Sequence, residues 1–455
     1  MGAGTAQGGA CLLISGKVRK NMEFVVFAGV LLLLFIFMIV QELIQTKNQE
    51  KLFKKYLREN YGKEPPKEYS LERFARLGSY LERHKEEKQL DDITWNDLGM
   101  DEVFRRIDRT YSAAGEEYLY YTLRNISCGR EAMEHLEEVV NWLQEQEDIK
   151  VRIQLLMKRL GHLGKYSLYD YLDNLDYLGE RSNRKIVLGN LLYLPFLLLL
   201  FVQPAMGTIG IVLCMLWHIM TYFREKKVIE PYIISFAYVL RLIDVCEELE
   251  KQKIPVYRRE LDELREVLKS LRELRRGSYW VMAGNQGKIG GNPLDILADY
   301  LRMILHLDIF QFNRMLEKLR KKTGQVENML AITGYLDMAI SVGGFRKSLE
   351  GYCIPKLEED TEKAFLHMKK GWHPLLSQPV KNSIRADRGI LLTGSNASGK
   401  STFLKMVAVN AVLAQTIHTC AAESYHAPIF QIFSSMALRD SMENGAVSYT
   451  HLTLP

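Results

Sequence analysis

The sequence predicts a mainly α-helical protein with transmembrane helices, followed by an incomplete α/β domain of the P-loop type. Three observations predict this class. First, the motif of a phosphate-binding loop, G-x-x-x-x-G-K-[ST], begins at Gly394. Second, two segments are apolar over lengths that could span a membrane. Third, helical periodicity continues almost without interruption from Val228 to Phe345. With 455 residues, of which 47% are hydrophobic, the chain can bury substantial cores and is long enough for roughly two to four domains.

The first apolar segment follows a glycine-rich and then basic stretch, residues 1–21. Phe24 to Gln41 carries no charge over 18 residues, which is enough to span a bilayer. A cleaved signal peptide is the alternative, but a small-residue cleavage site is missing, and Glu42 and a basic helix follow directly. We therefore predict an N-terminal segment with a transmembrane helix over residues 1–45, and Met22 is an alternative start of the chain.

Residues 46–90 are predicted to form a juxtamembrane linker, because basic side chains follow the span and Pro65 and Pro66 interrupt the helical pattern. The basic residues are Lys47, Lys51, Lys54, Lys55 and Arg58. Residues 91–183 are predicted to be a helical core region, in which one helix carries an apolar stripe that faces the core. The stripe consists of Leu136, Val139, Val140 and Leu143.

The second apolar segment, Ile186 to Phe223, has no Asp, Glu, Lys or Arg in 38 residues. Gln203, Pro204 and Gly207 interrupt its middle, so we predict a transmembrane hairpin of two short spans within residues 184–227, with His218 as an interfacial residue. A buried hairpin of a soluble protein is the alternative. Basic residues at both ends place both ends in the cytoplasm by the positive-inside rule. They are Arg184, Lys185, Arg224, Lys226 and Lys227.

Residues 228–355 are predicted to be a helical lever region with a long leucine stripe, which is typical of a lever helix or a coiled-coil seam. The stripe consists of Leu261, Leu264, Leu268, Leu271 and Leu274. The loop from Gly277 to Pro293 interrupts the pattern. Its Tyr279, Trp280 and Lys288 could touch a nucleic acid, although a surface turn between helices is the simpler interpretation.

Residues 356–455 are predicted to form a truncated P-loop domain. Gly389 to Thr393 is predicted to be a short strand and Ser401 to Gln415 a helix, which is the context that a phosphate-binding loop requires. The backbone N–H groups of the loop and the positive end of the helix dipole suit a phosphate, Lys400 suits the terminal phosphates, and Ser401 suits Mg²⁺. The predicted cofactors are therefore ATP and Mg²⁺. A glycine-rich turn without a ligand is the alternative. The predicted cofactor-binding residues are Gly394, Ser395, Asn396, Ala397, Ser398, Gly399, Lys400, Ser401 and Thr402, with Lys400 also catalytic and Ser401 the metal ligand.

The stretch TGSNASGKSTFLKMVAVNAVLAQTIHTCAAES resembles the ATPase domain of MutS-type DNA mismatch-repair proteins, and Asn396 is the telling residue of the loop. Residues on both sides of the loop also match that family, with Ala421 where the family usually has proline. They are Trp372, His373, Pro374 and Leu375 upstream, and Leu413, Ala414, Gln415, Ala422 and Glu423 downstream.

Two helical segments extend the resemblance. Met100 to Arg124 is similar to the family's core segment, and a second segment is similar to the place where the lever helices return to the ATPase domain. The first match rests on Arg109, Thr110, Ser112, Gly115 and Leu119, and the second on Leu336, Asp337, Ser341, Tyr352 and Pro355. The resemblance implies a helical core and lever region before an ABC-type P-loop domain, a homodimer through the ATPase domain, and mismatched or branched DNA as a partner.

Two features of the family are missing. The family's mismatch-reading domain carries a Phe-x-Glu wedge, but no such tripeptide precedes Asp91. Hydrolysis requires a strand that ends in Asp-Glu after the loop, but the chain has no acidic residue after Glu443. Asp440 to Gly445 still resembles the segment before the family's signature loop, and Ser448 is an ambiguous match to its serine. We expect a truncated or frame-damaged end and little turnover by this chain.

Composition limits the function classes. Lys and Arg, 60 in all, exceed Asp and Glu, 55, by too little to indicate nucleic-acid binding by charge alone. The six cysteines contain no C-x-x-C pair, which favours neither a zinc site nor a disulfide framework. The leading hypothesis is a MutS-like ATPase in the cell membrane, multi-pass, with its ATPase domain in the cytoplasm, that couples nucleotide state to DNA. The alternative is a membrane scaffold whose nucleotide-switched helical arm binds protein partners.

Overall fold

The computed structural model describes residues 37–435 except for 39, 42–43, 64–68, 70, 87, 127–128, 164–166, 275–292, 360–362 and 396–397. The chain divides into two units, Met1–Glu59 with Gly290–Ile296, and Asn60–Ile289 with Leu297–Pro455. The described part of the first unit is helical over residues 44–59. Several predictions fall outside the described residues: most of the first apolar segment, Pro65 and Pro66, nearly all of the loop from Gly277 to Pro293, Asn396, Ala397, and the segment from Asp440 onward.

The second unit begins with a helical region. Its helices are α2 (Leu71–Arg83), α3 (Asp92–Leu98), α4 (Met100–Ile107), α5 (Ala113–Arg124), α6 (Arg130–Glu145), α7 (Glu147–Leu160) and α8 (Leu168–Asp173), followed by the 3-10 helix η1 (Leu175–Leu178). The apolar stripe predicted on α6 is buried, with Val139 fully buried and Leu136 4% exposed, so the prediction of a core face is confirmed. Local chemistry sets the helix starts: Asp91 accepts from the backbone N–H of Thr94 at 2.8 Å and caps α3.

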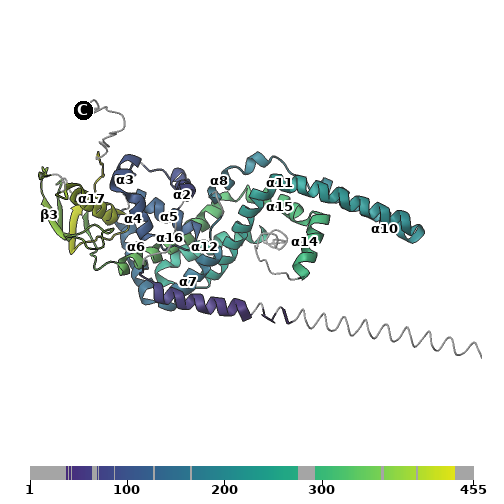
Figure 1. Cartoon of the computed structure of the whole chain (residues 1–455), viewed down its shortest axis with the longest axis horizontal. Coiled ribbons are helices and arrows are strands. Elements are labelled where there is room, and N and C mark those ends of the chain that lie inside the picture. The colour runs from purple at the N-terminus through teal and green to yellow at the C-terminus, as the bar shows by residue number, and fades with distance from the viewer. Residues whose placement is uncertain are drawn as a thin grey trace, which may run out of the picture. The chain divides into compact units, whose positions relative to one another are not determined.

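The second apolar segment forms a hairpin. Its helices are α9 (Arg184–Leu191), α10 (Tyr193–Val202) and α11 (Pro204–Glu250), so the predicted break at Gln203 is confirmed. Figure 1 shows α10 lying along the first part of α11. Glycines allow this close approach, because a Cβ on Gly207 would lie 2.6 Å from the backbone nitrogen of Leu200, and one on Gly210 2.0 Å from the ring of Phe196.

The structure adds two features to this hairpin. Its second helix, α11, extends beyond the apolar segment: it is 47 residues long and runs from Pro204, through Pro231, to Glu250. Its distal part packs on α7, α12 and α16, which stabilises the helix beyond the apolar stretch. His218, predicted to be interfacial, is buried within the protein: it is 1% exposed, and its Nδ1 lies 3.2 Å from Nδ1 of His306.

The hairpin is long and apolar enough to cross a membrane. Within the described residues, two helical stretches meet this criterion by length and composition, Arg184–Val202 and Pro204–Glu250. Most of the first stretch is uncovered, since 6% of its most apolar window is buried, against 28% for the second. Phe201 is 90% exposed and Leu198 69% exposed. A surface of this kind marks an interaction with a membrane or another protein.

The lever region completes the helical part. Its elements are η2 (Pro255–Tyr257), α12 (Arg258–Leu271), η3 (Arg272–Leu274), α14 (Pro293–Leu305), α15 (Leu307–Leu319) and α16 (Thr323–Ser348). The predicted leucine stripe on α12 and η3 is buried, at most 8% exposed at Leu268, which confirms that it faces the core. Helix α16 lies at the centre of the unit and packs against α4, α5, α6, α7, α11 and α12.

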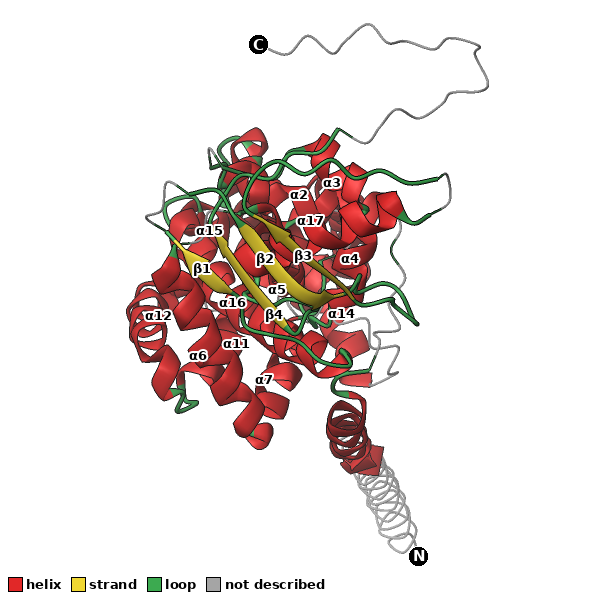
Figure 2. Cartoon of the chain, turned by 90° about the vertical axis from the view of Figure 1, so that its left-hand side faces the viewer, coloured by secondary structure: helices red, strands yellow, loops and turns green. Residues whose placement is uncertain are grey.

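A small mixed sheet follows. Its strands are β1 (Lys356–Glu358), β2 (Leu366–Gly371), β3 (Asn382–Ala386) and β4 (Ser424–Pro428), in the order β1-β4-β2-β3. β1 runs parallel to β4, whereas β2 is antiparallel to both β3 and β4. Figure 2 shows these strands side by side with helix α17 (Lys400–Thr416) behind them. Val409, Val412 and Leu413 of α17 are fully buried.

The predicted strand from Gly389 to Thr393 is not formed. These residues have no regular structure, and they are exposed, with Ile390 53% and Leu391 88% accessible. A strand exists only where neighbouring strands satisfy its backbone N–H and C=O groups. No described residue pairs with this segment, so its apolar sequence alone does not make it a strand. The helix predicted from Ser401 to Gln415 is confirmed to within one residue at each end.

Candidate nucleotide-binding site

The predicted phosphate-binding loop leads directly into α17. Gly399 is the N-cap of this helix and has a φ of 84°, a left-handed conformation that glycine adopts without strain. Its carbonyl oxygen accepts from the backbone N–H of Phe403 at 2.8 Å, so the helix is regular from its first turn. The backbone N–H groups of a helix's first turn have no partner within the helix, and together with the helix dipole they attract anions.

Lys400 lies at the start of α17 and folds back onto the loop. Its Nζ donates to the carbonyl oxygens of Gly394 at 2.7 Å and Ser395 at 2.5 Å. The backbone N–H of Ser398 donates to the oxygen of Ser395 at 3.3 Å and tightens the turn. These contacts fix the ammonium beside the loop backbone, next to the N-terminal end of α17.

The residues present fit a phosphate better than they fit a metal on its own. The hydroxyls of Ser401 and Thr402 are on exposed residues in the first turn of α17. Among the described residues, no group of three or more His, Cys, Asp or Glu side chains could hold a metal ion. In phosphate-binding loops, a hydroxyl at the position of Ser401 binds Mg²⁺ together with oxygens of the bound nucleotide.

Asn410 connects α17 to the segments before and after it. Its Nδ2 donates to the carbonyl oxygen of Trp372 at 3.0 Å, and its Oδ1 accepts from the backbone N–H of Ala421 at 2.7 Å. Trp372 N in turn donates to the oxygen of Ala421 at 2.9 Å. The two flanks that carry the family resemblance thus meet at one fully buried amide. Asn410 was not among the predicted residues, although a polar residue on an otherwise apolar helix face is a signal for a buried polar contact.

The other residues singled out around the loop have structural roles. Gln415 is fully buried, and its Oε1 accepts from the backbone N–H of Phe430 at 2.7 Å. Glu423 pairs with Lys369 at 2.7 Å and Lys370 at 2.8 Å across the sheet. His373 is buried, and burial lowers the pKa of its imidazole, with a smaller effect of Lys405. Leu413, Ala414 and Ala422 belong to the core.

Arg346 joins the far end of α17 to the helical region. It lies near the end of α16, and its guanidinium donates to both carboxylate oxygens of Glu137 on α6, at 3.0 and 2.7 Å. The same group donates to Thr419 Oγ1 at 2.8 Å and to the carbonyl oxygen of His418 at 3.0 Å, immediately after α17. Burial alone would raise the pKa of Glu137, but His418 and Arg346 outweigh it and lower the pKa to about 2. Neither Arg346 nor Glu137 was among the predicted residues, because nothing in the sequence near either one indicates the other.

A second buried junction joins α5 to α16 and unites the two helical segments that carry the resemblance. The carboxylate of Asp337 accepts from the hydroxyl and the backbone N–H of Ser112, at 2.6 and 2.8 Å. Ser341 Oγ accepts from Arg109 N at 2.8 Å and donates to the carbonyl oxygen of Ile107 at 2.8 Å. Glycine is required at position 115, because a Cβ atom there would lie 2.4 Å from the carboxylate of Asp337.

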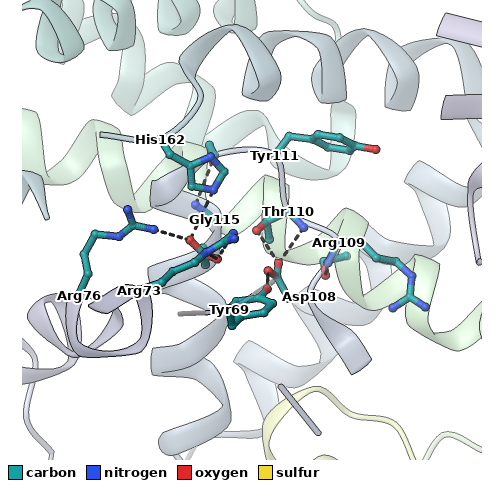
Figure 3. Close-up of polar contacts among 12 residues, drawn as sticks. Tyr69, Arg73, Arg76, Asp108, Arg109, Thr110, Tyr111, Gly115 and His162 are labelled. Atoms are coloured by element: carbon teal, nitrogen blue, oxygen red, sulfur yellow. Dashed lines mark hydrogen bonds and ion pairs between the residues drawn. The ribbon is translucent and has the colours of Figure 1, made fainter. Parts of the chain in front are cut away.

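A cluster of charges surrounds the start of α5. Glu116 is fully buried, and its carboxylate binds Arg73 at 2.7 Å, Arg76 at 2.9 Å and His162 at 3.4 Å. Figure 3 shows Arg73, Arg76 and His162 arranged around this point, with Asp108 and Thr110 close by. The cluster fixes α2 and the segment after α7 to α5. The cluster is distant in sequence from the predicted phosphate-binding loop, and its role is to hold these helical segments together.

The structure also places four more of the residues that carry the resemblance in the helical segments. Leu119 and Leu336 are fully buried in the α5 and α16 packing, and the ring of Tyr352 lies 5.5 Å from the guanidinium carbon of Arg346. Pro355 is buried just before β1. The segments around Arg109 and around Asp337 therefore do come together. The loop leads into α17, which packs against α3 and α5 and is followed by the turn that Arg346 of α16 binds.

Comparison with known proteins gives partial matches to MutS-type proteins. No protein-family model matches the chain. The DNA mismatch repair protein MutS of Acholeplasma laidlawii is 31% identical over 144 residues, which are 30% of this chain and 17% of that protein. That of Pelotomaculum thermopropionicum is 30% identical over 172 residues, 34% of this chain and 19% of the relative. MutS protein homolog 4 of Homo sapiens is 27% identical over 158 residues, 33% and 16% of the two lengths.

The matched part is less than a fifth of the length of each of these relatives. About a third of this chain is therefore related in sequence, at about 30% identity, to MutS-type proteins.

Proposed function

We propose that this chain is a membrane-anchored, MutS-like ATP-binding protein, in which the nucleotide state of the loop controls how the helical region holds a DNA partner. ATP with Mg²⁺ binds at residues 394–402. Two copies pair through their P-loop domains, and mismatched or branched DNA is the partner. Two of the three relatives named above are DNA mismatch repair proteins, which supports the choice of DNA.

One observation carries this proposal. Helix α17 begins at Lys400 in the loop and ends at the turn that Arg346 holds against Glu137. A phosphate bound at the first turn of α17 acts on a rigid helix of 17 residues whose other end is hydrogen-bonded to α16. Since α16 is the central helix of the unit, a shift of α17 is transmitted to the helices packed around it.

The role of each loop residue follows from its place. The N-terminal amides of α17 bind phosphate oxygens, and the Lys400 ammonium exchanges its two carbonyl partners for the terminal phosphates. Ser401 contributes its hydroxyl to Mg²⁺. Charge-assisted hydrogen bonds of this kind are stronger than neutral ones, so nucleotide replaces the internal contacts of Lys400.

Lys400→Ala tests the nucleotide site. We expect it to weaken binding of a fluorescent ATP analogue by roughly tenfold to a hundredfold, since a charge-assisted hydrogen bond is worth about 1.5–3 kcal/mol. Lys405→Ala, on the same helix but away from the loop, is the matched control and should bind as the wild type does. Equal affinity of all three proteins, with unchanged helical circular dichroism, would show that the loop does not hold phosphate.

DNA coupling and membrane insertion need separate tests. The full chain in lipid nanodiscs should bind a four-way junction with an affinity that changes on addition of Mg-ATP, and Lys400→Ala should abolish the change. Nucleotide binding without DNA binding would favour the protein-binding scaffold. The chain should also resist carbonate extraction from membranes, and its recovery in the soluble fraction would remove the anchor from the proposal.

A further inference from the structure

Two cysteines face each other at the joint between the lever region and the sheet. Cys353 and Cys420 form an isolated antiparallel bridge, in which each backbone N–H donates to the other's carbonyl oxygen at 3.0 Å. Residues paired in this way have Cα atoms about 5.5 Å apart. Disulfides span Cα distances of about 4.4–6.8 Å, so the backbone already has a separation that a disulfide requires.

The two thiols have different surroundings. Cys420 is fully buried, whereas Cys353 is only partly buried. The hydrogen bond from Cys420 lowers the pKa of Cys353, against the opposing effect of burial. Burial raises the pKa of Cys420. Cys353 is thus the more accessible and more nucleophilic of the two, with a second thiol in contact with it.

The pair lies beside the contacts of Arg346. Cys353 follows α16, and Cys420 follows the turn at His418 and Thr419 that Arg346 binds. The sulfur of Cys420 also lies 3.6 Å from the carbonyl oxygen of Asn410 on α17. A covalent link between the two cysteines would therefore tie the exit of α16 to the exit of α17.

We propose that Cys353 and Cys420 form a reversible disulfide by exchange with a low-molecular-weight disulfide such as oxidised glutathione. This inference goes beyond the proposed function and does not depend on nucleotide or DNA binding. Intracellular disulfides are usually transient and redox-sensing, which suits a pair placed where two helices end.

The chemistry proceeds by two exchange steps. The Cys353 thiolate attacks one sulfur of glutathione disulfide, which forms a mixed disulfide and releases one glutathione thiolate. The Cys420 thiol then passes its proton to the departing glutathione sulfur as its own sulfur attacks the Cys353 sulfur, which forms the protein disulfide and releases the second glutathione. The protein thiols are oxidised by two electrons, and glutathione disulfide is reduced to two glutathione molecules that take up the two protons.

Peptide mapping of the folded, full chain tests the proposal. The protein in lipid nanodiscs is treated with oxidised glutathione, alkylated, denatured, alkylated with a second reagent and digested. We expect a peptide pair that links Cys353 to Cys420, lacks two hydrogens and disappears on reduction. Cys246 is fully buried and is the internal control, which should be alkylated only after denaturation. Cys353 and Cys420 both recovered as free thiols would overturn the proposal.

Single variants separate the roles of the two thiols. Cys420→Ser should stop at the first step and leave glutathione on Cys353. Cys353→Ser should take up no glutathione at Cys420, because that thiol is buried. A glutathione adduct on Cys420 in the second variant would contradict the assigned order. Peptide mapping of the wild-type protein shows by itself whether the disulfide forms, so the proposal can be tested even if a substitution impairs folding.

Discussion

The carboxylate of Asp337 accepts a hydrogen bond from the hydroxyl of Ser112, with the two oxygens 2.6 Å apart. Ser112 also caps α5, because its Oγ accepts from the backbone N–H of Gly115 at 3.0 Å. One hydroxyl therefore starts α5 and fixes it to α16, although the two residues are separated by 225 positions in the chain. This junction explains why a serine, a glycine and an aspartate occur together in the two helical segments.

Asp337→Ala should destabilise the protein by about 2–5 kcal/mol. The substitution leaves the Ser112 hydroxyl and two backbone N–H groups without an acceptor in a fully buried place. Thermal and urea unfolding measure the effect. Asp262→Ala, which removes only exposed ion pairs on α12, is the control and should stay within about 0.5 kcal/mol of the wild type. Equal effects of the two substitutions would contradict the assigned role of Asp337.

Gly115→Ala and Gly78→Ala should change stability in opposite directions. A Cβ on Gly115 would lie 2.4 Å from Oδ2 of Asp337, so alanine forces the α5 and α16 helices apart, at a cost of about 1–3 kcal/mol. Gly78 lies within helix α2, and a Cβ there meets nothing within 4 Å, so alanine should stabilise by about 0.4–1 kcal/mol. Unfolding midpoints of the two variants decide this. Stabilisation by Gly115→Ala would mean that the close crossing does not exist.

Arg346→Ala should lower stability by about 3–5 kcal/mol, since it leaves the Glu137 carboxylate and the turn after α17 without their shared donor. Arg346→Lys keeps the charge but cannot bind two carboxylate oxygens and the turn together, and it should recover only part of the loss. If the joint transmits the nucleotide state, both variants also weaken the effect of Mg-ATP on DNA binding. Full recovery with lysine would show that charge alone matters.

The ion pair between Arg346 and Glu137 also makes the free energy of unfolding depend on pH. The folded-state pKa of Glu137, about 2, lies below its ordinary value of 4.5, so the pair contributes stability above pH 4.5 that is lost as the pH falls toward 2. Arg346→Ala should therefore show a smaller loss of stability than the wild type over that range. If the free energies of unfolding of the wild type and Arg346→Ala fell in parallel as the pH was lowered, the pair would be ruled out as the cause.

Glu117 should give the opposite pH dependence. Burial raises the pKa of this carboxyl to about 8, although Ser167 Oγ lies 2.9 Å from both of its oxygens and opposes the shift. The folded state then holds a proton that the unfolded state releases, so stability falls as the pH rises from 4.5 to 8. Glu117→Gln should gain stability relative to the wild type across this range. Glu134→Gln, at an exposed position, is the control and should show no such trend.

Much of the helical fold could be predicted from the sequence, because its signals are local. The stripe with Leu136 and Val140, the leucine stripe of α12, the break at Gln203 and the bounds of α17 all depend on residues within a few turns of one another. Periodicity and turn chemistry determine such features before any tertiary contact forms. The glycine spacing at the start of α17 belongs to the same class, since a left-handed Gly399 and the helix after it are neighbours in the chain.

Tertiary structure decided the rest. Arg346 and Glu137 are separated by 209 positions, Asp337 and Ser112 by 225, and neither pair has a sequence signal that names its partner. The sequence around His218 predicts an interfacial residue, but His306, 88 positions away, lies against its ring and the residue is buried. Ile390 and Leu391 have the composition of a strand, yet their backbone groups find no neighbouring strand among the described residues. A helix satisfies its backbone hydrogen bonds from within, so sequence alone predicts it, whereas strands and buried polar pairs exist only when the fold supplies a distant partner.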